Sequence, residues 1–335
     1  MSVTPADLLA RVLPCVISGG RPSLRERPVH KFLHSLHNVT ADPVWVVRDD
    51  DAAGYQRDDH EVAAYERGWA EEYARQHWTD VRPMTPGGFL GPFPGREFAC
   101  RLAEERGCWA VLQLDDNIDE LALWKLSATT VRIARQQGGL ALFADTLAAV
   151  LLSTSAAMAG AQLTAVSSPQ DLRHFTRAGY PYSLFAERTR PGRPPWLGPS
   201  EDDILHALQY ATSAAPVTAA VVLPLRYKKE RASTTGLRAW YDHDRSAGLQ
   251  RMFPEAAQIT VKTSHANGQG TGRVFHTMRP LGRYAPLTIA DRPLYEAARE
   301  RIAAIARDCA ADVRAANLAK AERRAARARS LPAVH

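Results

Sequence analysis

The 335-residue sequence predicts an α/β fold of Rossmann type, in which a mixed, mostly parallel sheet is flanked by helices and followed by a basic C-terminal helix. Three observations predict this fold. Short apolar runs alternate with amphipathic stretches through the first third of the chain, as strands and helices do around parallel sheets. Two of these runs end on clustered acids. From Pro293 to near Ser330 the chain is rich in alanine and arginine, which predicts one long helix.

Apolar runs and helical periodicity place the expected elements along the chain. In the first third we expect strands at 12–18, 44–47, 81–84 and 109–114, and helices at 28–36, 61–73 and from Gly95 to Gly107. The Gly/Pro-rich segment 85–95 matches neither the strand pattern nor the helix pattern. Further on we expect a helix at 141–158 and strands at 162–166, 180–185, 217–223 and 259–263, while 121–126 and 129–134 fit either type.

Composition limits the classes of protein to consider. The hydrophobic fraction of 45% and charged fraction of 23% are those of a globular protein. Since no apolar run is long enough for a membrane span and the N-terminus lacks a signal-peptide pattern, we expect no membrane partner and a cytoplasmic location, in a host cell if phage-encoded. Four scattered cysteines argue against zinc and disulfide frameworks. The net charge of +6 favours a polyanionic partner weakly.

Asp115 and Asp116 directly follow the apolar run 109–114. A strand that ends on two acids delivers carboxylates to the edge of the sheet where α/β folds bind ligands. Hard divalent cations prefer such oxygens and keep positions open for phosphate. The alternative is a polar turn, because Asp and the following Asn117 favour turns.

The end of the first predicted strand is a candidate nucleotide site. The predicted turn between this strand and the next helix contains Ser18, Gly19 and Arg21. A plain connecting loop without a binding role is an equally good explanation. Asp49 follows the next strand. Arg96 lies at the start of a helix, where free N–H groups and a guanidinium can face an anion.

A second acid cluster, Glu201, Asp202 and Asp203, follows Ser200. Ser200 is a suitable N-cap, and acids in a first turn match the helix dipole, which explains the cluster structurally. The functional alternative is that one acid is a general base facing the cleft.

Two basic segments and two histidines complete the candidates. Arginines in the loop 188–193 and the cationic, aromatic segment 224–241 suit phosphate contact and base stacking, although solvated surface charge is the commoner explanation. The predicted contacts are Arg188, Arg190, Arg193, Arg226, Lys228, Lys229 and Arg231. His265 and His276 bracket a glycine-rich loop and suit a metal or a diphosphate, or a structural role.

In this order the motifs resemble those of a GT-A glycosyltransferase. The Gly-Arg-led helix at Gly95-Arg96 and the turn Leu114-Asp115-Asp116-Asn117 look like those of the TET/JBP-associated glycosyltransferases, which are linked to glucosylation of 5-hydroxymethylpyrimidines in DNA. The resemblance covers most of the first 280 residues as short motifs. It departs at Arg96-Glu97, where many GT-A enzymes have Arg-Asn, and at Asp-Asp-Asn in place of Asp-x-Asp.

The resemblance implies a GT-A-like domain at 1–290, with a nucleotide-sugar half at about 1–160 and an acceptor half at about 161–290, and a basic helical extension at 291–335. It implies a hexosyltransferase that moves sugar from a UDP-sugar, such as UDP-glucose, to 5-hydroxymethylcytosine in double-stranded DNA. The implied roles are Mn²⁺ or Mg²⁺ binding by Asp115, Asp116, His265 and His276, donor binding by Ser18, Gly19, Arg21, Asp49, Arg96, Asp115 and Asp116, and proton removal by Asp202, Asp203 or Glu201.

Several alternatives stay open from the sequence. The acceptor base could be 5-hydroxymethyluracil, or the sugar could go to a protein, lipid or glycan. From other classes, the chain could be a metal-dependent nuclease that uses Asp115 and Asp116, or a non-catalytic DNA-binding protein.

Overall fold

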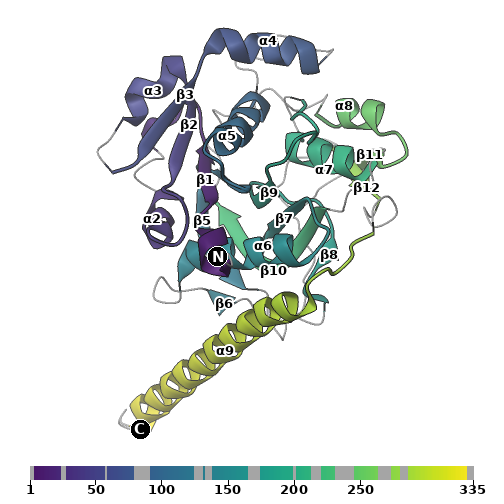
Figure 1. Cartoon of the computed structure of the whole chain (residues 1–335). Helices are drawn as coiled ribbons and strands as arrows, with labels where there is room; N and C mark the ends of the chain where they lie inside the picture. Colours follow the sequence, from purple (N-terminus) through teal and green to yellow (C-terminus); the bar gives the residue numbers. More distant parts are fainter. Residues whose placement is uncertain are drawn as a thin grey trace.

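The computed structural model describes residues 4–23, 28–56, 59–78, 91–123, 131–132, 138–164, 174–198, 201–212, 220–230, 245–262, 273–279 and 286–329. One ten-stranded sheet forms the centre of the molecule, helices cover it, and a long C-terminal helix extends away from it (Figure 1). The predicted strand 81–84 lies outside the described residues, as do Arg231 and His265.

The first half of the sheet is parallel. Its strand order is β3-β2-β1-β4, and all three pairings are parallel. The bounds are β1 (Val12–Ile17), β2 (Val44–Arg48), β3 (Glu61–Tyr65) and β4 (Ala110–Asp115). Because strands run in the same direction here, their carboxyl ends share one edge of the sheet.

The second half of the sheet is mixed. β9 (Leu184–Arg188) runs antiparallel between β4 and β7 (Met158–Leu163), and β10 (Ala220–Lys229) is parallel to β7. β5 (Ile118–Leu123), β6 (Val131–Arg132) and β8 (Arg177–Ala178) complete it through antiparallel pairs. β5, β8 and β9 therefore oppose the other seven of the ten strands, which confirms the predicted mixed, mostly parallel sheet flanked by helices. A separate hairpin pairs β11 (Ala257–Lys262) with β12 (Arg273–Met278).

The helices cover both faces of this sheet. Their bounds are α1 (Pro5–Leu9), α2 (His30–Leu33) with the 3₁₀ turn η2 (His34–Leu36), α3 (Asp49–Tyr55), α4 (Arg67–His77), α5 (Phe93–Glu105), α6 (Gly139–Ser153), α7 (Asp202–Thr212), α8 (Arg245–Met252) and α9 (Arg292–Arg329). No helix in these described stretches is long and apolar enough to cross a bilayer.

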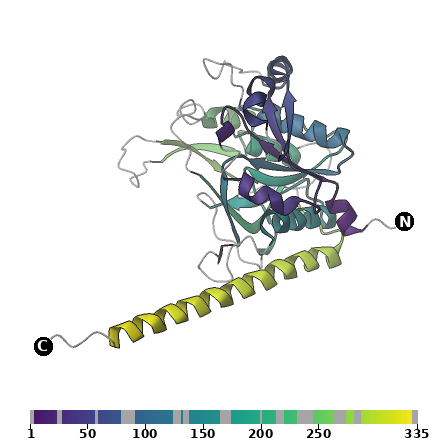
Figure 2. The same cartoon turned by 90° about the vertical axis from the view of Figure 1, so that its left-hand side faces the viewer.

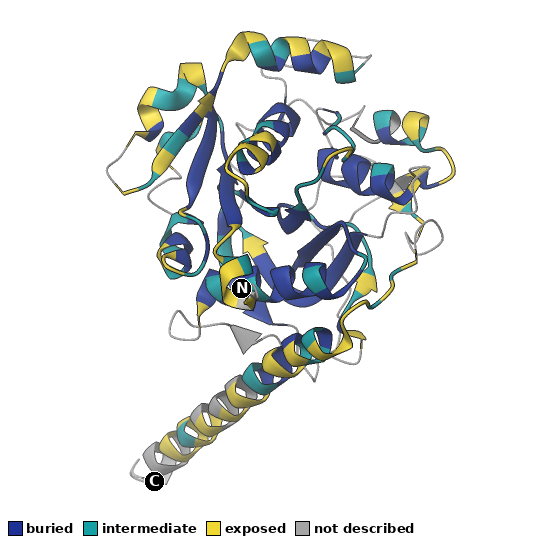
Figure 3. Cartoon of the chain, in the orientation of Figure 1, coloured by how far each residue is buried: buried dark blue, intermediate teal, exposed yellow. Residues whose placement is uncertain are grey.

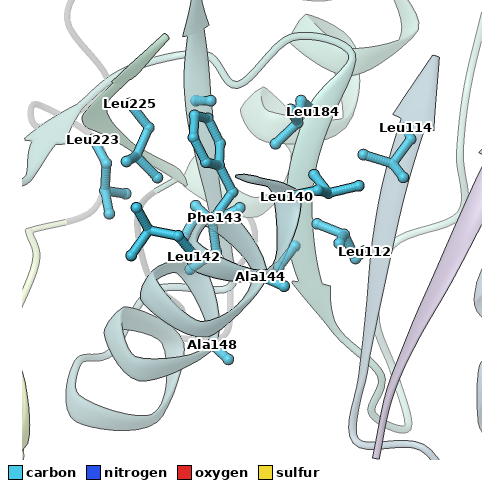
Figure 4. Close-up of a cluster of buried hydrophobic side chains, with 14 of the residues drawn as sticks. Leu112, Leu114, Leu140, Leu142, Phe143, Ala144, Ala148, Leu184, Leu223 and Leu225 are labelled. Atoms are coloured by element: carbon cyan, nitrogen blue, oxygen red, sulfur yellow. The ribbon is translucent and has the colours of Figure 1, made fainter. Parts of the chain in front are cut away.

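Residue alternation along β1 divides the core into two clusters. Val12 and Val16 pack into the cluster that contains α2, α6 and the start of α9, whereas Leu13, Cys15 and Ile17 pack into the cluster that contains α5 and α7. Successive strand residues point to opposite faces, so a strand that is apolar throughout must be covered on both. Figure 4 shows part of the first cluster, where α6 inserts Leu140 and Phe143 against the sheet.

Gly107 ends α5 as the sequence predicts. It has a left-handed φ of 66°. Its N–H donates to Glu104 O at 3.0 Å, and the N–H of Cys108 donates to Ala103 O at 2.9 Å, which together form a Schellman cap. This cap turns the chain into β4 and so positions the acids that follow.

The final helix has two environments. Its first turns pack on α6 and bury Tyr295, Ala298 and Ile302, and Arg301 pairs with Asp145. Beyond Ala306 the described side chains are mostly exposed, and both views show this end standing away from the body (Figures 2 and 3). The predicted C-terminal helix is confirmed, with one packed and one projecting part.

Several predicted elements differ from the structure. Of the expected strand 180–185 only Leu184 and Phe185 belong to β9, and of the expected strand 162–166 only Gln162 and Leu163 belong to β7. Helix α5 begins at Phe93, within the segment 85–95 that was expected to be neither helix nor strand. The expected helix 61–73 is strand β3 followed by α4, because Val62 and Tyr65 match a strand next to β2 as well as they match a helical face. The expected helix 141–158 ends at Ser153, and β7 begins at Met158. The expected strand 217–223 continues to Lys229, so part of the predicted basic loop is strand β10.

Candidate active site

The candidate site is at the carboxyl edge of the sheet, where β1 and β4 end side by side. Ile17 and Asp115 are register partners. The residues that follow them, Ser18 and Asp116, therefore lie next to each other, and Ser18 Oγ donates to Asp116 Oδ2 at 2.5 Å. The two motifs predicted from the sequence thus form one site.

Asp116 is enclosed by donors. Its side chain is 0% exposed, and Arg21 Nη2 donates to Oδ1 at 2.9 Å. Tyr55 OH lies 2.7 Å from Ser18 Oγ and accepts from the N–H of Arg21 at 3.0 Å, so it fixes the turn that carries both partners. Burial raises the pKa of Asp116 to about 6, which Arg21 and Ser18 offset only in part.

Asp115 lies between two cations. Arg96 Nη2 donates to Oδ1 at 3.0 Å, and Lys229 Nζ donates to Oδ2 at 2.5 Å. Burial opposes ionisation, but Lys229 and Arg96 outweigh it and hold the pKa of Asp115 well below its usual value. Asp115 is therefore a carboxylate at neutral pH.

Arg96 joins the two acid clusters. It is 2% exposed, and its Nε donates to Asp202 Oδ2 at 2.5 Å while its Nη2 contacts Asp115. Its guanidinium lies over the rings of Phe185 and Trp196, at 5.5 and 5.3 Å from their centroids. This side chain is fixed on all sides, because charge-assisted bonds and aromatic faces both hold it.

The acids at the start of α7 face this buried guanidinium. Asp202 and Asp203 are 5% and 8% exposed. Burial, together with the charge of Asp202, raises the pKa of Asp203 to about 8. Asp203 therefore carries a proton at neutral pH next to the ion-paired Asp202. Glu201 precedes them with a φ of 56°, a left-handed conformation that turns the chain into the helix.

A buried polar network holds α7 in place. His206 Nε2 lies 2.6 Å from Glu187 Oε1, and Tyr210 OH donates to the same oxygen at 2.8 Å. Trp196 stacks on His206 with centroids 3.9 Å apart. Since Trp196 also contacts Arg96, the helix that carries Asp203 and the guanidinium that binds Asp202 are positioned by one stack.

The donor set was tested for the predicted Mn²⁺ or Mg²⁺. Both oxygens of Asp115 already bind cations, and both oxygens of Asp116 accept hydrogen bonds. Asn117 Oδ1 is buried without a hydrogen-bond partner, but one amide oxygen is no metal site. Each of these carboxylate oxygens keeps a second lone pair, but the charges of Arg21, Arg96 and Lys229 next to them would repel a divalent ion. The residues as arranged do not fit the predicted metal.

Other predicted site residues lie elsewhere. Asp49 is exposed and accepts from the N–H of Arg67 at 3.2 Å, whereas its neighbour Asp51 accepts from the N–H of Gly20 at 2.8 Å. Of the three consecutive acids at 49–51, Asp51 is therefore the one that contacts the turn from Ser18 to Arg21. The sequence contains three consecutive acids here, and only the position of α3 separates their roles.

Several predicted DNA contacts have partners within the protein. Arg188 donates to the carbonyls of Ala156 and Thr154, and Arg193 forms a bidentate pair with Glu97 at 2.8 Å. Arg226 is 5% exposed in β10, and Lys229 binds Asp115. Arg188, Arg193 and Lys229 are therefore bound within the protein, and Arg226 is largely buried.

Lys228, Arg190 and His276 stay predictions. Lys228 is exposed, and Arg190 lies over the ring of Tyr210 at 5.6 Å. His276 is in β12, where its backbone pairs with Ile259, and its side chain is outside what the structure describes.

Sequence reasoning missed the roles of Lys229 and Tyr55. Lys229 was assigned to a basic loop, but β10 continues through it with a register shift between Lys228 and Lys229 that turns it toward Asp115. The strongly β-branched run that precedes it was the available signal. Nothing in the sequence indicates that Tyr55 reaches Ser18.

No protein-family model matches the chain, and no curated protein is significantly similar to it in sequence. Among solved structures, the chain is similar to mannosyl-3-phosphoglycerate synthase from Rubrobacter xylanophilus. That match has 14% identity and a TM-score of 0.41, and covers 88% of this chain and 93% of the other. Likeness at this level does not establish a function.

Proposed function

We propose that the protein is a glycosyltransferase that moves a sugar from a nucleotide-sugar donor to the hydroxymethyl group of 5-hydroxymethylcytosine in DNA. The observation that carries the proposal is the contact of one buried guanidinium, Arg96, with acids from both halves of the chain, Asp115 and Asp202. Through these contacts the sheet edge that would bind the sugar donor lies next to α7, the helix that carries the protonated Asp203.

The donor side is the edge formed by β1 and β4. Ser18, Gly19 and Arg21 would contact the nucleotide, and Arg21 and Lys229 are the partly exposed cations of the site, with side chains 42% and 27% exposed. Their charges would offset the negative charge that develops on the departing diphosphate. Lys229 would then supply the positive charge next to the diphosphate that was expected from a metal ion.

The acceptor side is the start of α7. In the transfer, the bond between the sugar's anomeric carbon and the diphosphate oxygen breaks, and a bond to the acceptor oxygen forms. Asp203 would take the acceptor's hydroxyl proton once it is ionised, and its pKa of about 8 suits a base near neutral pH. Asp202 would orient it from its pair with Arg96.

The acceptor class rests on charge. The chain carries a formal +6, Lys228 is exposed next to the site residue Lys229, and Lys320 and Arg323 are exposed on the projecting part of α9. A hydroxymethyl group on a pyrimidine lies in the major groove, so the enzyme must reach in or extrude the nucleotide. The uracil analogue is the nearest competing acceptor.

Incubation with UDP-sugars and hydroxymethylated DNA, followed by digestion to nucleosides and mass spectrometry, tests the proposal. We expect a hexose-sized mass gain on 5-hydroxymethyl-2′-deoxycytidine, none on unmodified DNA, and none with Asp203→Asn. Donor hydrolysis or transfer to glycans without any DNA product would remove the DNA acceptor and keep the transferase. No turnover of any donor would remove the enzyme.

A further inference from the structure

A second cluster of titratable side chains lies apart from the acid site. It brings together His30 from α2 with Asp59 and His60, which directly precede β3. One potential ligand atom from each lies within 4.8 Å of the others. Among the residues that the structure describes, this is the only group of three or more His, Cys, Asp or Glu side chains whose potential ligand atoms lie this close together.

The cluster lies next to β3, at the end of the strand order β3-β2-β1-β4, and the acids Asp115 and Asp116 are at the end of β4. Glu61, the first residue of β3, pairs with Val44 of β2, and Val44 is level with Cys15 of β1 and so with Gln113 of β4. Asp115 is the last residue of β4 and is at the carboxyl edge. His60 therefore lies only about three residues before Asp115 along the strand direction, and the two groups are separated mainly across the sheet, by strands that are about 4.8 Å apart.

We propose that His30, Asp59 and His60 form a binding site for Zn²⁺. Two imidazoles and a carboxylate are the ligand types that zinc prefers, and three protein ligands leave a fourth position for water. His30 and Asp59 are 30% and 45% exposed, so an ion and its water have access. The set lacks the oxygen-rich shell that Mg²⁺ or Ca²⁺ requires.

The pair of ligands from His30 and Asp59 needs only a small adjustment to hold zinc. His30 Nε2 lies 2.6 Å from Asp59 Oδ2, a hydrogen-bond distance. Zinc bonds of about 2.0–2.2 Å at a tetrahedral angle place a nitrogen and an oxygen ligand about 3.3 Å apart. The ion would therefore replace the shared proton while the two atoms separate by less than about 1 Å.

A neighbouring histidine provides a matched control. His37 stacks on His60 with ring centroids 5.7 Å apart, but its Nδ1 faces Asp42 at 3.6 Å. It shares the surface, charge and aromatic environment of the cluster without belonging to the three ligands. Its replacement should leave zinc binding intact.

Calorimetric titration of the metal-stripped full-length protein with ZnCl₂ tests the site. We expect saturable binding of one ion, weakened at least about tenfold in His30→Gln and His60→Gln and unchanged in His37→Gln, since loss of even an outer-shell partner costs about 10–100-fold. Absence of saturable binding in the wild type would overturn the proposal, as would wild-type affinity in both ligand variants.

A second measurement covers the case in which a variant does not fold. In the wild-type protein, the imidazole proton signals of His30 and His60 should move or broaden on zinc addition before those of His37 and His77. Zinc-induced changes confined to other histidines would place the ion elsewhere and overturn the site.

Discussion

Arg96 Nε donates to Asp202 Oδ2 at 2.5 Å, across 106 positions of sequence. This pair is buried, and the same guanidinium holds Asp115. It makes the N-terminal, parallel half of the sheet and α7 into one site. Removal of either partner leaves a charge without compensation in a place from which water is excluded.

Arg96→Met should destabilise the fold by about 3–5 kcal/mol, the cost of breaking a buried ion pair. Arg101→Met is the control, because Arg101 belongs to the same helix, pairs with Glu97 and is 46% exposed. An exposed pair contributes about 0–1 kcal/mol. Urea denaturation of both variants gives the comparison. Equal losses would mean that the buried pair has no special role.

Asp203 predicts the pH dependence of turnover. With its pKa at about 8, Asp203, the proposed general base, is protonated at neutral pH and loses its proton as pH rises, so turnover should increase up to about pH 8 and then level off. Asp203→Asn should reduce turnover by about 10²–10⁴-fold and abolish this rise. A turnover profile that is flat from about pH 6 to about pH 8 would contradict the role of Asp203 as the general base.

The same group predicts how stability depends on pH. The folded state raises the pKa of Asp203 from 3.8 to about 8, so it retains a proton that the unfolded chain releases. Its contribution to stability should therefore fall as pH rises between these two values and stay constant above them. Denaturation midpoints of the wild type should decline across this window more steeply than those of Asp203→Asn. Parallel curves would show that the pKa is not raised.

Lys229 is expected to replace a metal at the donor site. Lys229→Met should weaken UDP binding by about 10–100-fold, the value of a charge-assisted hydrogen bond, while EDTA leaves wild-type affinity unchanged. Lys228→Met, one residue away on the exposed side of β10, should bind like the wild type. Calorimetry measures all three. A strict need for Mn²⁺ would restore the metal assignment of Asp115 and Asp116.

Gly160 lies where β7 passes close to its neighbours. A Cβ there would be 2.4 Å from Pro181 Cβ and 3.0 Å from Leu184 O. Gly160→Ala should cost about 1–3 kcal/mol through overpacking. Gly68→Ala in α4 meets no atom within 4 Å and should stabilise by about 0.5–1 kcal/mol. Thermal denaturation checks that the two effects have opposite signs.

The two parts of α9 should respond differently to truncation of an apolar side chain. Ile302 is 0% exposed against α6, and Leu318 is 63% exposed on the projecting part. Ile302→Ala should cost about 2–5 kcal/mol, and Leu318→Ala less than about 0.5 kcal/mol. A large cost at Leu318, measured by denaturation at low protein concentration, would mean that this part of the helix is covered.

The sequence by itself determined the elements whose signals are local. Apolar runs identified β1, β2 and β4, the acids at their ends, and Arg96 near the start of α5, because backbone periodicity and strand-end positions follow from neighbouring residues. The same local signals failed for residues 61–73, where a short apolar pattern satisfies both a strand and a helical face.

Only the tertiary structure decided which polar groups meet. It paired Lys229 with Asp115 and Arg193 with Glu97. It also placed Asp51, and not Asp49, against the turn at residues 18–21, and it brought His30 next to His60. These contacts depend on strand register and on helix packing between segments distant in sequence. Register is set by the burial of whole faces, so the partner of a single charged side chain is not encoded near it.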